Sequence, residues 1–185
     1  MKKLFTALLA AALISPMSLY AAEPSHLYIG AAWGNYSLDI KNYSASYDSS
    51  SGLALDIGYD FTNVFAIQGS YIAPDTFQAS SGNDENISYA TSLFARANLR
   101  FQRWTLFGLA GGTSVSGNNA EYVNTINPAY GVGIDFYGTK DVAITLKYVN
   151  YVDAKLKVIG NDVSLSGTTI GFTYYFDTPR FSKRY

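Results

Sequence analysis

The fold is decided most clearly by residues 53–61, which read Leu-Ala-Leu-Asp-Ile-Gly-Tyr-Asp-Phe. Every second residue from Leu53 to Phe61 is large and apolar, whereas the residues between them are Ala, Asp, Gly and Asp. Alternation with a period of two is typical of a β-strand with two unlike faces. Two carboxylates and a glycine would make a poor core, so the two faces of this strand must meet different surroundings.

Seven further stretches are predicted to be strands, and all of them except 104–113 show the same alternation: 27–33, 64–73, 88–101, 104–113, 129–136, 142–148 and 169–176. In the fourth strand of the chain we expect Ser88 and Arg96 on the polar face. The fifth strand is apolar on both faces, and a two-residue turn after Phe101 would place Trp104 on the same outward face as that ring. The sequence therefore predicts an all-β fold of eight strands.

The connections between these strands alternate strictly between tight and long. The tight ones are 62–63, 102–103 and 138–141, and the long, polar ones are 39–51, 74–86, 114–126 and 153–162. This order predicts an antiparallel up-and-down meander with all tight turns at one end. Short periplasmic turns and longer external loops are typical of outer-membrane barrels.

The composition indicates a surface that faces something other than water. Charged residues make up only 15% of the 185 residues and aromatic residues 16%, whereas a soluble domain carries about 25% charged residues. The length suits one domain. The chain has no Cys, which excludes disulfides and thiolate metal sites. The net charge of −1 gives no basis for nucleic-acid binding.

A soluble β-sandwich or a lipocalin-like barrel is the main alternative. Its apolar face would point inward and its charges outward, so alternation alone leaves both possibilities open. Aromatic residues favour the membrane barrel, because on the apolar face they gather near the short turns: Tyr59, Phe61, Phe65, Phe101, Trp104, Phe136 and Phe176. Such clustering is typical of an interfacial aromatic girdle.

The last stretch carries a resemblance to a known family. Thr169, Gly171, Tyr174 and Phe176 follow the spacing polar–x–Gly–x–x–aromatic–x–aromatic, which resembles the C-terminal assembly signal of outer-membrane proteins. Residues 25–176 as a whole resemble a small OmpA/OmpX-like barrel of the porin family. The resemblance implies an eight-stranded antiparallel up-and-down transmembrane β-barrel in the cell outer membrane, inserted by the barrel-assembly machinery.

We expect three segments along the chain: a signal peptide at 1–21, the outer-membrane β-barrel at 22–176 and a basic periplasmic tail at 177–185. Lys2 and Lys3 precede an apolar run of about 11 residues, too short for the span of about 20 that a membrane anchor needs. The family usually ends at the final aromatic residue, so the tail is a departure. It is either a loose terminus or a contact with anionic head groups or peptidoglycan.

The sequence offers no candidate catalytic residue, cofactor site or metal site. His26 is the single histidine and stands before the first strand, at the periplasmic end. A base there cannot reach a serine in the external half, and a nucleophile must lie within hydrogen-bond distance of its base. One His without Cys also excludes the usual zinc sites. We therefore expect a protein that is not an enzyme.

Six charged residues should project into the barrel lumen: Asp56, Asp60, Arg96, Arg100, Asp135 and Lys147. An eight-stranded barrel has an interior just wide enough for side chains. Three acids and three bases could pair there, since an unpaired buried charge is costly. We expect a salt-bridged plug, and a narrow ion path is the alternative.

The long loops are the other candidate for function. They carry aromatic residues among polar and acidic ones: Tyr43, Tyr47, Phe77 and Tyr122. We expect a structural or surface-interaction role, of adhesion type, through these loops; the alternative is a narrow pore or a conduit for small or hydrophobic compounds. The expected partners are outer-membrane lipid and lipopolysaccharide, the assembly machinery and a host or surface ligand. We expect a monomer that binds no nucleic acid.

Overall fold

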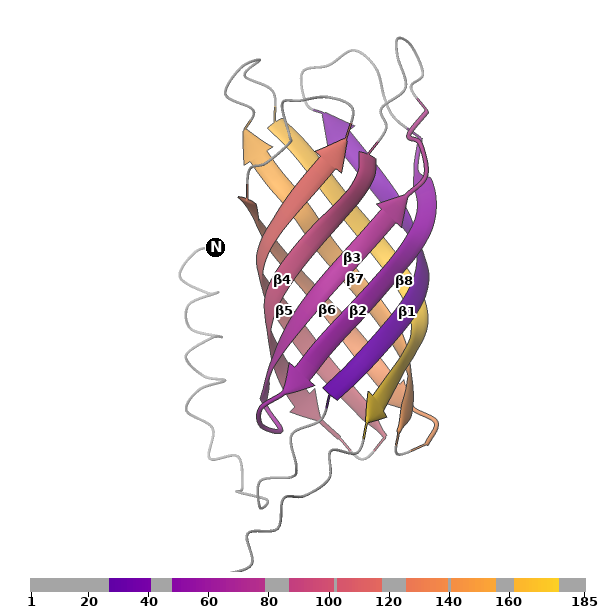
Figure 1. Ribbon diagram of the computed structural model, residues 1–185, viewed down its shortest axis with the longest axis vertical. Coiled ribbons are helices and arrows are strands. Elements are labelled where there is room, and N and C mark those ends of the chain that lie inside the picture. The colour runs from indigo at the N-terminus through magenta and orange to yellow at the C-terminus, as the bar shows by residue number, and fades with distance from the viewer. Residues whose placement is uncertain are drawn as a thin grey trace, which may run out of the picture.

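The eight strands close into one antiparallel barrel (Figure 1). The computed structural model describes residues 27–40, 48–78, 87–101, 103–117, 126–139, 141–155 and 162–176. The strands are β1 Leu27–Ile40, β2 Ser50–Asp60, β3 Phe65–Pro74, β4 Ile87–Arg100, β5 Trp104–Gly117, β6 Ile126–Tyr137, β7 Val142–Lys155 and β8 Asp162–Phe176. Each pairs with the next, and β8 returns to β1. The predicted eight-stranded up-and-down barrel is confirmed.

The tight turns gather at one end of the barrel, here called the turn end, and the strand ends that flank the long connections lie at the other, here called the loop end (Figure 1). Threonine side chains help to fix two of the turns. Thr62 Oγ1 accepts hydrogen bonds from the amides of Val64 and Phe65, at 3.2 and 3.0 Å. Thr139 Oγ1 accepts one from the Val142 amide at 3.1 Å.

Near the turn end the outer face is apolar, as a lipid-facing wall requires. Trp33 is 57% exposed and Phe172 is 65% exposed. The predicted girdle residues also face outward, and Phe101 stacks on Trp104 with ring centroids 4.1 Å apart. The predicted outward register of Trp104 is therefore correct. No helix among the described residues is long and apolar enough to cross a membrane.

Toward the loop end the polarity of the two faces reverses. On β1, Tyr36 and Leu38 point inward and are buried, whereas Asn35 and Ser37 are exposed. On β8, Leu165 is 1% exposed and lies in the apolar cluster that fills this part of the interior. Such an arrangement, apolar inside and polar outside, is that of a water-soluble barrel.

This reversal explains why β1, β7 and β8 extend further toward the loop end than the alternating stretches recognised in the sequence. The alternation was recognised only to residue 33 in β1 and to residue 148 in β7, with long connections expected from 39 and 153, whereas these strands end at Ile40 and Lys155. In β8 it was recognised only from residue 169, whereas the strand begins at Asp162. The outward-apolar template stops matching where the polarity changes, although backbone pairing continues. The long connections in the structure are correspondingly shorter than the sequence predicted.

Two side-chain placements were also wrong. Ser88 was expected inside, but the β4–β5 register shifts between Ile87 and Tyr89, and Ser88 is exposed. A β-bulge of this kind changes the face on which the following residues lie. Phe77 was expected in an exposed loop, but it is fully buried in the apolar cluster.

The wall is not continuously paired at the loop end. Among the described residues, pairing between β3 and β4 stops at Ile72, and pairing between β6 and β7 stops at Tyr130. Pro74 lies beyond the first point and pairs only with β2, and Pro128 lies beyond the second and pairs only with β5. Proline has no amide hydrogen, so it cannot donate to a second neighbouring strand. The two prolines thus mark two seams that divide this part of the wall.

Candidate functional site

The six predicted lumen charges all lie on the inner face of the barrel and form three ion pairs. Arg96 pairs with Asp135, Arg100 with Asp60, and Lys147 with Asp56. The nitrogen–oxygen distances in the latter two pairs are 2.6 and 2.7 Å. The side chains of Arg96, Asp135 and Lys147 are almost fully buried, whereas that of Arg100 is 28% exposed.

Arg96 is the centre of this network. Its Nε donates to Asn98 Oδ1 at 2.8 Å, its Nη1 donates to Gln68 Oε1 at 3.2 Å, and its Nη2 donates to Asp135. The guanidinium carbon also lies 3.8 Å from the centre of the Phe107 ring. A desolvated guanidinium over an aromatic face adds about 2 kcal/mol to such a site.

A chain of hydrogen bonds joins this centre to the Lys147–Asp56 pair. Gln68 Nε2 donates to Ser70 Oγ at 3.2 Å, and Ser70 Oγ donates to Asp56 Oδ1. Lys147 Nζ donates to both Asp56 oxygens, at 2.8 and 2.7 Å. A single polar network therefore crosses the lumen, and its three acids and three bases balance in charge.

Asp135 is held from its other side as well. Thr145 Oγ1 donates to Asp135 Oδ1 at 2.7 Å, and Tyr175 OH donates to Asp135 Oδ2 at 2.9 Å. Thr173 lies 2.7 Å from Thr145 Oγ1 and can donate to it, since the Thr145 proton is already used. Buried charges with this many partners are held rigidly, because each lost partner would leave a desolvated group unpaired.

Glycines that make room for large interior rings were not predicted from the sequence. Gly58 stands directly opposite Tyr28, and Gly133 stands directly opposite Phe107. A Cβ at Gly133 would lie 2.3 Å from the tip of the Phe107 ring. Rings laid over a cross-strand glycine are a recognised way of filling a curved barrel. In the sequence, such a glycine can be recognised because it stands two residues from another inward-facing position. Which ring lies over it can be told only when the register between the strands is known.

The apolar cluster closes the interior above the network. Phe94, Leu109 and Val149 lie in it, together with the rings of Tyr36 and Tyr151. These two tyrosines lie toward the loop end, beyond the outward apolar band. The described interior thus has two closed layers, a paired charge network and an apolar core.

The residues of the predicted assembly signal divide between the faces of β8. Thr169 and Gly171 are on the inner face, and Tyr174 and Phe176 are on the outer face. Gly171 packs against β1, because a Cβ there would lie 2.4 Å from the Ala32 Cα. The segment therefore forms the strand that closes the barrel.

Several predicted features lie outside the described residues. They are the signal peptide 1–21, the tail 177–185, His26 and the loop residues Tyr43, Tyr47 and Tyr122. Within the described part of the chain, no three acidic, His or Cys side chains are grouped so that they could hold a metal ion.

Comparisons with known proteins agree with this geometry. The family model for the outer membrane protein beta-barrel domain matches residues 5–176. OprG from Pseudomonas aeruginosa is 12% identical, with 84% of this chain and 98% of that chain covered and a TM-score of 0.58. Ail, the attachment invasion locus protein of Yersinia pestis, solved with the heparin analogue sucrose octasulfate, is 19% identical, with 83% and 100% covered and a TM-score of 0.56.

Neisserial surface protein A is 14% identical, with 83% of this chain and 100% of that chain covered and a TM-score of 0.54. No curated protein sequence matches the chain. At these identities the solved structures establish the fold. The family model covers nearly the whole chain and therefore also establishes kinship and location. The protein is an integral barrel of the cell outer membrane and belongs to the outer membrane protein β-barrel domain family.

Proposed function

We propose that this protein is a sealed, non-enzymatic barrel that serves as a rigid scaffold for surface interaction through its external loops. The observation that carries the proposal is the two-layered interior. Each of the six charges in the network around Arg96 has an ion-pair partner, and the apolar core that contains Phe94 and Leu109 lies above it. An ion that entered from the turn end would have to lose its hydration in the apolar layer.

Planar bilayer recording tests the sealed lumen. Purified protein should give no steady conductance at salt concentrations where a large porin, used as the positive control, conducts. Steady, salt-dependent conductance would contradict the sealed lumen and support the alternative of a narrow pore. We propose that the six charged residues of the lumen network act as a structural plug inside the barrel.

The extension at the loop end supports the scaffold role. On β1 and β8 the strands continue past the apolar band, with Ser37 and Ser166 on the outside and Leu38 and Leu165 inside. This part has its own core, so it can hold the external connections at a fixed height above the bilayer. Loops on a rigid scaffold commonly carry binding function.

The charge of the external connections favours a neutral or basic ligand. Acidic residues outnumber basic ones in the long connections that the sequence predicts; Asp48, Asp75, Asp84, Glu85 and Glu121 are among the acids. Ail shares the fold and was solved with a heparin analogue, which is polyanionic. Repulsion between like charges makes a polyanion a poor ligand for the acidic loops of this chain.

Cells that display the protein test this role. Cells with the native barrel should adhere to surfaces coated with neutral glycan or basic protein better than cells whose barrel has all four long connections replaced by short Gly/Ser linkers. Surface levels of the two barrels must be matched by heat-modifiable migration on gels. Equal adhesion of the two cell types would sink the interaction role and leave a purely structural barrel.

A further inference from the structure

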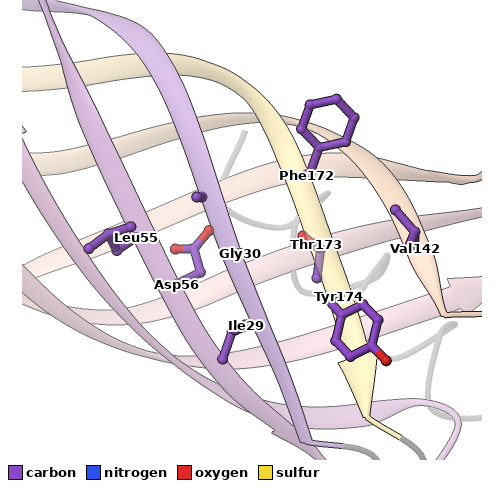
Figure 2. Close-up of a pocket in the computed structure, with 9 residues that line it drawn as sticks. Ile29, Gly30, Leu55, Asp56, Val142, Phe172, Thr173 and Tyr174 are labelled. Carbon is purple, nitrogen blue, oxygen red and sulfur yellow. The ribbon is translucent and has the colours of Figure 1, made fainter.

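A groove of about 550 Å³ runs across the outer surface near the turn end (Figure 2). Its walls are apolar side chains from β2, β1, β8 and β7: Leu55, Ile29, Ala31, Phe172, Tyr174 and Val142. A volume of about 300–1,000 Å³ is usual for a small-molecule site. The groove is therefore large enough to hold a defined ligand.

The groove exists because Ala31 is small where its neighbours are large. Ala31 is directly opposite Leu55 on one side and Phe172 on the other. All three point outward, and both partners are more than 40% exposed. A methyl group between two large side chains leaves a depression that crosses the β1–β8 closure of the barrel.

The polar groups at the floor of the groove already have hydrogen-bond partners within the protein. Figure 2 shows Asp56 and Thr173 on either side of Gly30. The Asp56 carboxylate is already bound by Lys147, and the Thr173 hydroxyl lies 2.7 Å from that of Thr145. Both groups are thus satisfied within the network, so the groove suits an apolar occupant.

We propose that this groove holds one acyl chain of a phospholipid from the periplasmic leaflet, as a lipid bound at a fixed place. The groove opens from the lipid-facing wall of an outer-membrane barrel, so hydrocarbon is what surrounds it. Val142 follows the 138–141 turn directly, which places the groove in the periplasmic half of the membrane. A depression left empty would forfeit dispersion contacts along its whole lining.

Lipid retention tests the proposal directly. Ala31→Phe should fill the groove, and Ala110→Phe on β5 adds the same bulk at another outward alanine. After purification in mild detergent and addition of phosphatidylethanolamine, native mass spectrometry should show one retained lipid per native barrel and per Ala110→Phe barrel. The Ala31→Phe barrel should retain at least tenfold less. Equal retention by all three proteins, or a dimer in place of the lipid-bound monomer, would overturn the proposal.

A second measurement leaves Ala31 untouched. The chain has two tryptophans. Trp33 is on the same face of β1, two residues from Ala31, whereas Trp104 begins β5. Phosphatidylcholine with brominated acyl chains quenches tryptophan on contact. In micelles, emission of the Trp104→Phe variant should fall saturably near one lipid per protein, and emission of Trp33→Phe should fall only in proportion to lipid. Identical quenching curves for the two variants would contradict a bound chain.

Discussion

Lys147 and Asp56 are 91 residues apart in the chain, and inside the barrel the Lys147 ammonium donates to both Asp56 oxygens, at 2.8 and 2.7 Å. Removal of one partner leaves the other charge buried without compensation. Lys147→Met should therefore lower the free energy of unfolding by about 3–5 kcal/mol. Urea unfolding of the barrel in detergent micelles or lipid vesicles measures this change.

The double variant Lys147→Met/Asp56→Leu is the matched control for that prediction. It removes both charges, so no unpaired ion remains, and apolar replacement of a whole buried pair is often close to neutral. Its loss of stability should be clearly smaller than that of Lys147→Met. A double variant as unstable as the single one would show that the pair is not coupled in the way that its geometry indicates.

Gly133 should not tolerate a side chain. The Phe107 ring that covers it is held on its face by Arg96, so it cannot move away freely. Gly133→Ala should lower stability by about 1–3 kcal/mol, as overpacking does. Gly108→Ala on the outer face is the control, because a Cβ there meets nothing within 4 Å. Equal effects of the two substitutions on urea midpoints would contradict the ring-over-glycine packing.

Leu165 and Ser166 test the reversal of polarity at the loop end. Leu165 is buried in the apolar cluster and its neighbour Ser166 faces outward. Leu165→Ala should cost about 2–5 kcal/mol, as for other core leucines, whereas Ser166→Ala should change stability by less than about 0.5 kcal/mol. If Ser166→Ala were the more damaging of the two, the assignment of the faces in this extension would be wrong.

Phe176 tests the proposal that the last strand is the assembly signal. Phe176 and Tyr174 share the outer face of β8, and their rings contact edge to face with centroids 4.8 Å apart. Phe176→Ala should slow insertion in cells, seen as less heat-modifiable barrel in the outer membrane. Phe172→Ala, also outward on β8, is the control for lost lipid-facing surface. Equal yields for native protein and Phe176→Ala would remove the support for an assembly role of that residue.

The charges and rings of this barrel were predictable from the sequence to different degrees. The period-two pattern placed Asp135 and Lys147 on the inner face, because neighbouring side chains of a strand point in opposite directions. It placed Phe101 outside for the same reason, and the two-residue turn after Phe101 placed Trp104 on the same face. It failed at Ser88 because a single bulge shifts the register and leaves no mark in composition.

The predictions for Phe77 and for the strand ends were wrong for a different reason. The prediction assumed one surrounding medium for the whole strand, with lipid outside throughout. The polarity reverses toward the loop end, so Leu38 and Leu165 are core residues although Leu53 and Leu55 face outward. When the apolar residues change from the outer to the inner face within one strand, the alternation pattern breaks, and the break resembles the end of the strand.

The sequence by itself determined the number of strands, the order of turns and loops and the inside-out faces near the turn end, since all of these follow from side-chain direction along a local stretch. The tertiary structure alone decided which charges pair, which glycine receives which ring and where the seams at Pro74 and Pro128 lie. Those features depend on the stagger between strands and on contacts across the lumen. Such contacts join residues as distant as Asp56 and Lys147, and they exist only once the barrel has closed.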